Sequence, residues 1–207
     1  MVRVHIVTWS NRMRYKRLLE RHFRIRHDIY VKQRKWKALA RPIDIEIDAY
    51  DTQHAIYLLA LDDSARIVGG SRLVPTSEPH LMSEVFPALV RGKLPSAADI
   101  FEWTRFFVVP AMRRRGKPSP VAGFILCGLL EVALRLQIRQ ISVVCEAFWP
   151  ERLRSLGWTL TELGDVLAHP DGDIVALLID ANWQALESTR RAYGIRGSVL
   201  ADERDAG

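Results

Sequence analysis

The sequence has few cysteines, no long hydrophobic run and no excess of glycine or proline. Its two cysteines, Cys127 and Cys145, each lie in an apolar stretch, which excludes a disulfide framework and favours a reducing compartment. The longest apolar run, 121–130, is about half of what a membrane-spanning helix needs. The first residues lack the pattern of a signal peptide. We therefore expect a cytoplasmic globular protein that does not associate with a membrane.

Short catalytic and metal-binding motifs are also absent from the sequence. None of its 6 histidines forms a pair with another His or Cys at zinc-ligand spacing. It contains neither a Gly-x-Ser-x-Gly nucleophile elbow nor a phosphate-binding P-loop. A metal site, a serine hydrolase and a nucleoside triphosphatase are therefore not expected.

The charges are unevenly distributed along the chain. Residues 1–42 hold thirteen Lys and Arg against two carboxylates, a net charge of +11, whereas the whole chain carries only +6. Residues 43–63 contain six carboxylates and no Lys or Arg. Such a basic segment either pairs with the acidic segment that follows or binds an acidic partner, such as nucleic acid, an acidic carrier protein or a phosphate-rich molecule.

Hydrophobic periodicity predicts a single α/β domain over residues 1–207, with the last ten or so residues frayed. The apolar stripe of the first helix has a three- and four-residue repeat, and Ser10 or Asn11 is its expected N-cap. The expected helices are 10–35, 84–90, 119–136, 150–156 and 182–193, and the expected strands are 54–61, 66–74, 100–109, 140–145 and 174–180. This order predicts a three-layer αβα sandwich with a mixed central sheet.

Charged residues occupy several positions where these elements should be apolar. Arg26 lies on the stripe of the first helix, Arg72 shares a strand face with Val68 and Val74, and Glu102 and Arg105 interrupt the 100–109 strand. Because a buried ion needs a partner, the candidate partners are the carboxylates of the acidic segment, Glu46, Asp48 and Asp51. The alternatives are an arginine that extends to the edge of the stripe and an acidic segment that is a solvated turn.

The spacing of Glu102 and Arg105 adds a condition to this interpretation. Residues three apart in a regular strand face opposite sides of the sheet. Both side chains therefore reach one cleft only where a bulge or a splayed strand breaks the alternation.

A basic, glycine-containing loop joins the 100–109 strand to the next helix. It contains Arg113, Arg114, Arg115, Gly116 and Lys117. A strand, a basic turn and a helix N-terminus in succession are suited to binding phosphate, although a solvated loop has the same composition.

Several blocks of the sequence together resemble the acyl-homoserine lactone synthases, the autoinducer synthases of bacterial quorum sensing. The resemblance extends over residues 12–183, and its order and spacing are specific to that family. The matching residues are Arg26, Tyr30 and Trp36; the acidic block with Glu46, Asp48 and Asp51; the block GGSRL at 69–73 with Pro75 and Thr76; Phe86 and Pro87; and Glu102, Trp103, Thr104, Arg105 and Phe106.

The resemblance implies a fold similar to that of the N-acetyltransferases, and two substrates. These are S-adenosyl-L-methionine as acyl acceptor and an acyl thioester, carried by coenzyme A or by an acyl-carrier protein, as donor; no separate cofactor is implied. The chain departs from the family at Tyr30, where Phe is usual, and the extra hydroxyl requires a partner.

The resemblance also assigns roles to the matching residues. The S-adenosylmethionine-binding residues are Arg26, Tyr30, Trp36, Asp48, Asp51, Arg105 and Phe106, and the catalytic ones are Glu102, Asp48, Arg105 and Arg72. Asp48 and Asp51 hold the cationic parts of this substrate, and Arg105 or Arg26 holds its carboxylate. Glu102 is the expected general base, with Asp48 as the alternative. Backbone N–H groups near Phe106 stabilise the oxyanion.

The acyl group and its carrier follow less directly from the sequence. By resemblance the acyl pocket is lined by Trp103, Thr104, Val143, Phe148 and Trp149. Its aromatic residues favour a short, branched or aromatic acyl group, and Val143 offers no hydroxyl where relatives that accept 3-oxo chains often have Thr. The alternative is that Trp103 and Trp149 are core residues. Arg113, Arg114, Arg115 and Lys117 suit either coenzyme A phosphates or an acidic carrier.

Two other functions remain as alternatives. An ordinary N-acyltransferase, using acyl-CoA and a different amine, would share the fold without needing the acidic block at 46–51. A nucleic-acid-binding module would use the basic first helix, but its apolar stripe indicates packing on a sheet. We expect a monomer that binds no nucleic acid.

Overall fold

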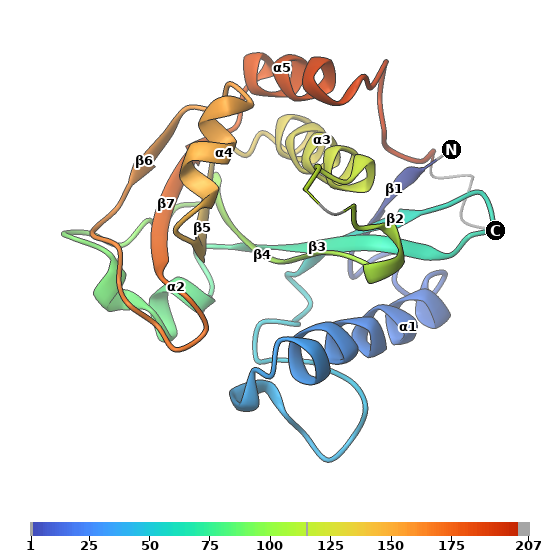
Figure 1. Cartoon of the computed structure of the whole chain (residues 1–207), viewed down its shortest axis with the longest axis horizontal. Helices are drawn as coiled ribbons and strands as arrows, with labels where there is room; N and C mark the ends of the chain where they lie inside the picture. The colour runs from blue at the N-terminus through green and yellow to red at the C-terminus, as the bar shows by residue number, and fades with distance from the viewer. Residues whose placement is uncertain (1, 115, 203–207) are drawn as a thin grey trace. The chain divides into compact units, whose positions relative to one another are not determined.

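The computed structural model describes residues 2–114 and 116–202, and Figure 1 shows the course of the chain. The strands are β1 (Arg3–Val7), β2 (Ile56–Leu61), β3 (Ile67–Pro75), β4 (Ile100–Val108), β5 (Gln140–Glu146), β6 (Leu160–Glu162) and β7 (Ile174–Asp180). The α-helices are α1 (Lys16–Arg26), α2 (Leu81–Glu84), α3 (Pro120–Arg135), α4 (Trp149–Ser155) and α5 (Trp183–Tyr193). Short π and 3-10 helices are η1 (His27–Gln33), η2 (Lys37–Leu39), η3 (Pro87–Leu89) and η4 (Pro110–Met112). All ten predicted elements are present in some form, whereas β1 and β6 were not predicted.

The strands form a mixed sheet in the order β1-β2-β3-β4-β5-β7-β6. The β1–β2, β5–β7 and β6–β7 pairs are antiparallel, and the β4–β5 pair is parallel. This arrangement confirms the predicted α/β class with a mixed sheet. The chain divides into two compact units, which we describe separately.

The first unit comprises Met1–Arg72, Arg105–Gly128 and Gly197–Gly207. Here α1 covers one face of β2 and β3, and the first part of α3 covers the other, so this unit has the predicted α–β–α layers (Figure 1). Two neighbouring glycines of β3 lie where helices pack closely on the two faces of the sheet. A side chain at Gly69 would meet Ile125 of α3, and one at Gly70 would meet His22 of α1.

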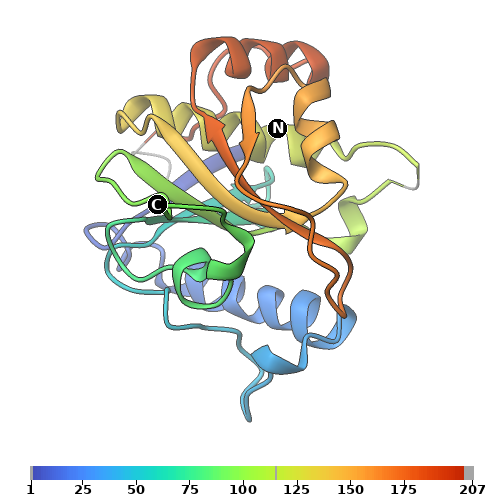
Figure 2. The ribbon, with the colours of Figure 1, turned by 90° about the vertical axis from the view of Figure 1, so that its left-hand side faces the viewer.

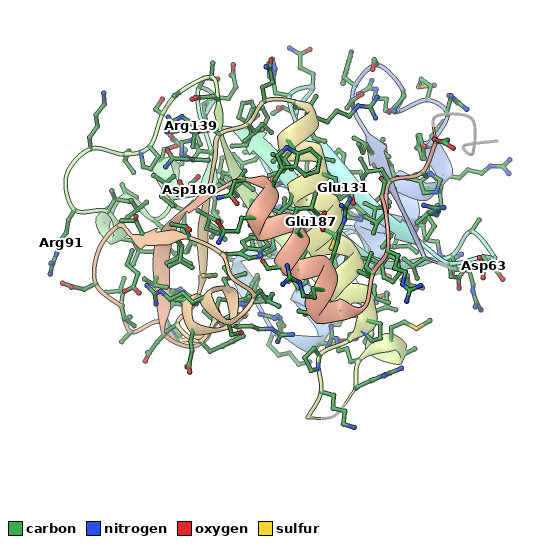
Figure 3. The ribbon with its side chains drawn as sticks, turned by 90° about the horizontal axis from the view of Figure 1, so that it is seen from above. Asp63, Arg91, Glu131, Arg139, Asp180 and Glu187 are labelled. Carbon is green, nitrogen blue, oxygen red and sulfur yellow. The ribbon has the colours of Figure 1, made fainter. Side chains whose placement is uncertain are left out.

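The second unit comprises Leu73–Thr104 and Leu129–Arg196. In Figure 2, β7 lies between β5 and β6. Arg190 of α5 pairs with Glu131 of α3 and with Glu187 one turn earlier in its own helix, and both carboxylates are labelled in Figure 3. The Asn182 side chain accepts a hydrogen bond from the Ala185 N–H and so caps the N-terminus of α5.

Two predictions about the ends of elements are wrong. The first helix begins at Lys16, not at Ser10 or Asn11, because the Asn11 side chain closes a preceding turn by accepting a hydrogen bond from the Thr8 N–H. Near the C-terminus, the Val4 N–H donates to Val199 and the Ala201 N–H donates to Val4. Residues 199–201 are therefore held against β1 rather than frayed, while 203–207 lie outside the described residues.

Within the described ranges, no helix is both long enough and apolar enough to cross a lipid bilayer.

Candidate active site

A buried cluster of three arginines and three carboxylates forms in the first unit. Arg26 comes from the end of α1, Arg72 from β3 and Arg105 from β4, while the carboxylates come from the segment between η2 and β2. Arg26 and Arg72 are 0% exposed and Glu46 is 1% exposed. Three of the four charged residues that the sequence placed at apolar positions, Arg26, Arg72 and Arg105, are therefore brought together with the acidic segment. The fourth, Glu102, lies in the second unit and is not part of this cluster.

Arg26 uses its whole guanidinium group within this cluster. Its Nε lies 2.5 Å from Glu46 Oε2, and its Nη1 and Nη2 lie 2.8 and 2.9 Å from the two oxygens of Asp51. A fork of this kind is the strongest geometry for an arginine–carboxylate pair. Arg26 thus ties α1 to the acidic segment.

Asp48 and Glu46 connect the other two arginines. Arg72 binds both oxygens of Asp48, at 2.6 and 3.0 Å, and Arg105 Nη2 lies 2.7 Å from Asp48 Oδ2. Arg105 also bonds to Glu46 through Nε and Nη2, at 3.1 and 3.0 Å. Each carboxylate of the cluster is shared between two arginines, since Arg72 also lies 2.8 Å from Asp51.

The local sequence of the acidic segment folds it around these ions. The Asp48 N–H donates to Asp51 Oδ2 and the Tyr50 N–H donates to Asp48 Oδ1. Tyr57 Oη donates to Asp51 Oδ1 over 3.0 Å. Carboxylates that bond to the backbone two or three residues away favour such a turn over a helix or strand.

Burial and ion pairing shift the pKa values of the buried carboxylates in opposite directions. Burial alone would raise the pKa of Glu46, but Arg26 and Arg105 lower it to about 2. For Asp51, likewise, Arg26 and Arg72 outweigh burial and hold its pKa well below the ordinary value. Glu46 and Asp51 therefore stay ionised at neutral pH.

The members of the cluster differ in exposure. The Asp48 and Arg105 side chains are 12% and 6% exposed, whereas Arg26 and Arg72 are 0% exposed. Asp48 and Arg105 thus have the most accessible side chains among the six ions. Arg26, which we considered as a partner for the substrate carboxylate, is instead occupied by Glu46 and Asp51.

The backbone of β4 is irregular at Arg105. Its φ of 54° lies in the left-handed region, which residues other than glycine adopt at a cost. A left-handed residue interrupts the regular alternation of strand faces at this point. In the next residue, the Phe106 carbonyl accepts a hydrogen bond from Tyr30 Oη over 3.0 Å.

An aromatic stack lies beside Arg105. The Tyr30 and Trp36 rings are stacked with centroids 5.1 Å apart, and the Arg105 guanidinium lies 5.6 Å from the Tyr30 ring centre. Tyr30 is buried on the π-helix η1, and burial raises its pKa to about 12. The Tyr30 hydroxyl, which was expected to need a partner, therefore has one in the Phe106 carbonyl.

His22 is buried in an aromatic box of the first unit. Its ring centre lies 5.6 Å from those of Phe23 and Tyr57 and 5.5 Å from that of Phe107. Neither ring nitrogen has a hydrogen-bond partner among the described residues. Burial, together with the nearby charge of Arg26, lowers the pKa of His22 to about 3.

We expect His22 to make the folded protein sensitive to acid. The unfolded histidine binds a proton near its ordinary pKa of 6.5, but the folded one does so only near 3. The free energy of unfolding should therefore fall as the pH is lowered from 6.5 towards 3. Urea denaturation of His22→Phe should show a smaller loss of stability between about pH 6.5 and 5. His54→Phe, at an exposed site, is the control; equal slopes for both variants and the wild type would refute this role for His22.

Glu102 belongs to the second unit and is 0% exposed. Its two oxygens accept hydrogen bonds from the N–H groups of Leu81 and Met82, at 2.8 and 2.6 Å. The carboxylate is thereby fixed in orientation against the first turn of α2.

The predicted acyl-pocket residues lie partly in the interior of the second unit. Trp103 is 4% exposed, and its ring centre lies 6.1 Å from that of Trp149 and 6.4 Å from that of Trp158. Thr104 and Val143 are buried. Phe148 differs: it is 57% exposed and stacks on Trp149 at the surface.

The described part of the basic loop holds three exposed cations, Arg113, Arg114 and Lys117, one of which also has a structural contact. Arg113 Nε donates to the Val108 carbonyl over 2.8 Å, so this arginine shapes the loop. Arg114 and Lys117 are exposed and form an isolated β-bridge with each other. Arg115 lies outside the described residues.

Sequence reasoning missed several residues of the ionic cluster and of the aromatic box around His22. Glu46 was considered as a partner but not as a site residue, although it joins Arg26 to Arg105. The contact of Tyr57 with Asp51 depends on tertiary structure and left no local pattern. A polar His22 on the apolar stripe of α1 was the one available sign of its burial.

Comparison with known proteins places these features in context. A family model described as autoinducer synthase matches residues 10–189. An isovaleryl-homoserine lactone synthase of Bradyrhizobium diazoefficiens is 38% identical over 201 residues, which cover 96% of this chain and 89% of that protein.

Solved structures are similar over nearly the whole chain. MesI, a CoA-dependent acyl-homoserine lactone synthase, is 70% identical, with a TM-score of 0.89 over 97% of this chain and 100% of MesI. BjaI, another CoA-dependent synthase, was solved with SAM and isopentyl-CoA; it is 37% identical, with a TM-score of 0.90 over 97% of this chain and 93% of BjaI. A putative N-acetyltransferase from Lactobacillus plantarum shares the fold at 13% identity and a TM-score of 0.55, over 87% of this chain and 99% of that one.

Proposed function

Since this chain belongs to the autoinducer synthase family, we propose that it joins S-adenosyl-L-methionine to a short, branched acyl group carried by coenzyme A. The product is an N-acyl-homoserine lactone and the by-product is methylthioadenosine. The observation that carries the donor assignment is the likeness to BjaI, whose structure holds SAM and isopentyl-CoA. The 70% identity to the CoA-dependent MesI supports the same donor.

The first unit supplies recognition of the acceptor. S-adenosyl-L-methionine carries a sulfonium, an α-amine and a carboxylate. We assign the amine to Asp48 and the carboxylate to Arg105, because these are the ions of the cluster with the most exposed side chains. We assign the sulfonium or the adenine to Trp36, which is half-buried, stacks on Tyr30 and has the Arg34 guanidinium 5.2 Å from its ring centre. The other ions, Arg26 and Arg72 with their carboxylate partners, hold this pair in position.

The second unit supplies the base for acyl transfer. The amine nitrogen attacks the thioester carbon, and Glu102 accepts the proton that the amine loses. The tetrahedral intermediate then expels the coenzyme A thiolate, which takes up that proton. Asp48 is the poorer candidate for this role, because both of its oxygens bind arginine. Backbone N–H groups near Phe106 are assigned to the oxyanion.

Ring closure needs less from the protein. The substrate carboxylate attacks its own γ-carbon, the C–S bond breaks, and methylthioadenosine leaves. The sulfonium is a good leaving group, so binding has only to hold the bent conformer in which carboxylate and γ-carbon are close.

The side chains assigned to the acyl group are apolar and aromatic. Trp103 and Val143 are buried in the second unit, and Val143 offers no hydrogen bond to a 3-oxo group. Bulky indole rings shorten a pocket and suit a compact branched chain. The assignment predicts poor use of long straight acyl groups.

A comparison of donors tests this function. The purified protein is incubated with S-adenosyl-L-methionine and with isovaleryl, hexanoyl or 3-oxohexanoyl groups, each carried by coenzyme A or by acyl-carrier protein. We expect the highest kcat/KM with isovaleryl-CoA. A higher value with any acyl-carrier donor would overturn the CoA assignment, and a preference for a straight-chain group would overturn the acyl assignment.

We expect the exposed cations of the basic loop to bind donor phosphates. The double substitution Arg114→Gln/Lys117→Gln should raise the KM for acyl-CoA several-fold without changing kcat, and more strongly at low salt, because salt screens such contacts. Lys93→Gln, at an exposed position of the second unit, is the control. An unchanged KM in the double variant at low salt would show that the loop does not contact the donor.

A further inference from the structure

A buried hydroxyl in the second unit is not used by the function described above. Ser142 of β5 is 0% exposed, and its Oγ has no hydrogen-bond partner among the described residues. A buried hydroxyl without a partner is unfavourable, and native proteins satisfy nearly all such groups through protein atoms, water or a ligand. The Ser142 hydroxyl therefore calls for a partner that the described residues do not provide.

The sheet register places Ser142 beside Glu102. The parallel ladder of β4 and β5 pairs residues 100–102 with 140–142, and in the described residues it ends at the Glu102–Ser142 pair. Both strands continue, β4 to Val108 and β5 to Glu146. Paired residues of adjacent strands point to the same face, so the hydroxyl and the carboxylate are neighbours at the last pair of the ladder.

The face holds further polar residues at Thr104 and Gln140, two residues from Glu102 and Ser142, but it is apolar on the side of β5 towards Glu146. Val144, two residues after Ser142, shares its face and packs with Met82 and Ala176 in a hydrophobic cluster. Glu102 lies against the same segment through its bond with the Met82 N–H. Against these apolar neighbours the Ser142 hydroxyl contributes nothing to packing that alanine would not.

We propose that Ser142 and Glu102 together hold a water molecule that carries the proton from the substrate amine to Glu102. The attacking amine gives a proton to this water while the water gives one of its own to the carboxylate. The protonated Glu102 later returns its proton by the same path to the coenzyme A thiolate. Ser142 is thus a positioning residue, and its role rests on the proposed function of Glu102 as base.

Three variants test this inference. Ser142→Ala removes the hydroxyl, and Ser142→Thr keeps it. Ser188→Ala is the matched control, because Ser188 Oγ has a protein partner, the Leu156 carbonyl at 2.6 Å. We expect Ser142→Ala to lower kcat roughly tenfold and to change the solvent deuterium isotope effect on kcat. Both KM values should stay unchanged, and the Tm should stay unchanged or rise. Ser142→Thr should retain most of the activity, and Ser188→Ala should lower the Tm without lowering kcat.

Other results would overturn the inference. If Ser142→Ala has a wild-type kcat and a higher Tm, the hydroxyl is only an unsatisfied core group. If its kcat falls together with its Tm, as a structural defect would cause, or if the isotope effect does not change, no positioned water is involved. A wild-type protein that forms no lactone would instead refute the proposed function.

Discussion

Replacing Glu46 by Gln is expected to lower the free energy of unfolding by about 3–5 kcal/mol, because it leaves buried arginine charge without its counter-ion. Glu46 is 1% exposed and bonds to both Arg26 and Arg105. The amide of Gln keeps the shape of the side chain but not its charge. Urea denaturation at pH 7, analysed by linear extrapolation, measures the difference.

The control for Glu46→Gln is an ion pair at the surface. Asp99 and Arg139 lie 2.9 Å apart with side chains 42% and 60% exposed. Such pairs contribute about 0–1 kcal/mol, so Asp99→Asn should have little effect. If Glu46→Gln is as mild as Asp99→Asn, the ionic cluster does not hold α1, β3 and β4 together as we describe.

The second large effect is expected at Glu102. Substitution by Gln removes the proton acceptor, and kcat should fall by about 10²–10⁴-fold, the usual contribution of general base catalysis. The KM for S-adenosyl-L-methionine should change little, because its recognition is assigned to the first unit. Steady-state assay of methylthioadenosine release measures both quantities.

Glu102→Gln also weakens the contact with α2, since an amide has one acceptor oxygen for the two N–H groups of Leu81 and Met82. A loss of stability must therefore be separated from a loss of chemistry. Glu131→Gln removes another buried carboxylate of the same unit, paired with Arg190, and should lower the Tm while keeping kcat. If the two variants lose the same fraction of kcat for the same loss of Tm, Glu102 is a structural residue and another group is the base.

Most of the fold could be predicted from local patterns. The strand 174–180 has the predicted bounds, and α3 begins and ends within one residue of its prediction, because long apolar runs and capping residues are local features. β1 was missed because a five-residue strand at a chain end carries too little alternation. β6 has only three residues, and the π-helix at His27–Gln33 has no sequence signature to distinguish it from an α-helix.

The site was predictable in composition but not in connectivity. Charged residues at apolar positions, such as Arg26 and Arg72, require buried partners, and the nearby acidic segment was an available source. Which oxygen binds which guanidinium depends on tertiary geometry, so the central place of Glu46 did not follow from the sequence. The exposure of Phe148 and the unpartnered hydroxyl of Ser142 are likewise visible only in three dimensions.

The ratio of methylthioadenosine to free coenzyme A released from one incubation tests the account most directly. Isovaleryl-CoA and S-adenosyl-L-methionine are supplied together, and the thiol and the nucleoside are quantified at several times. If the acylated amino acid closes to the lactone, the two products form in a one-to-one ratio. Release of coenzyme A with an acylated amine but without methylthioadenosine would show an ordinary N-acyltransferase and contradict the account.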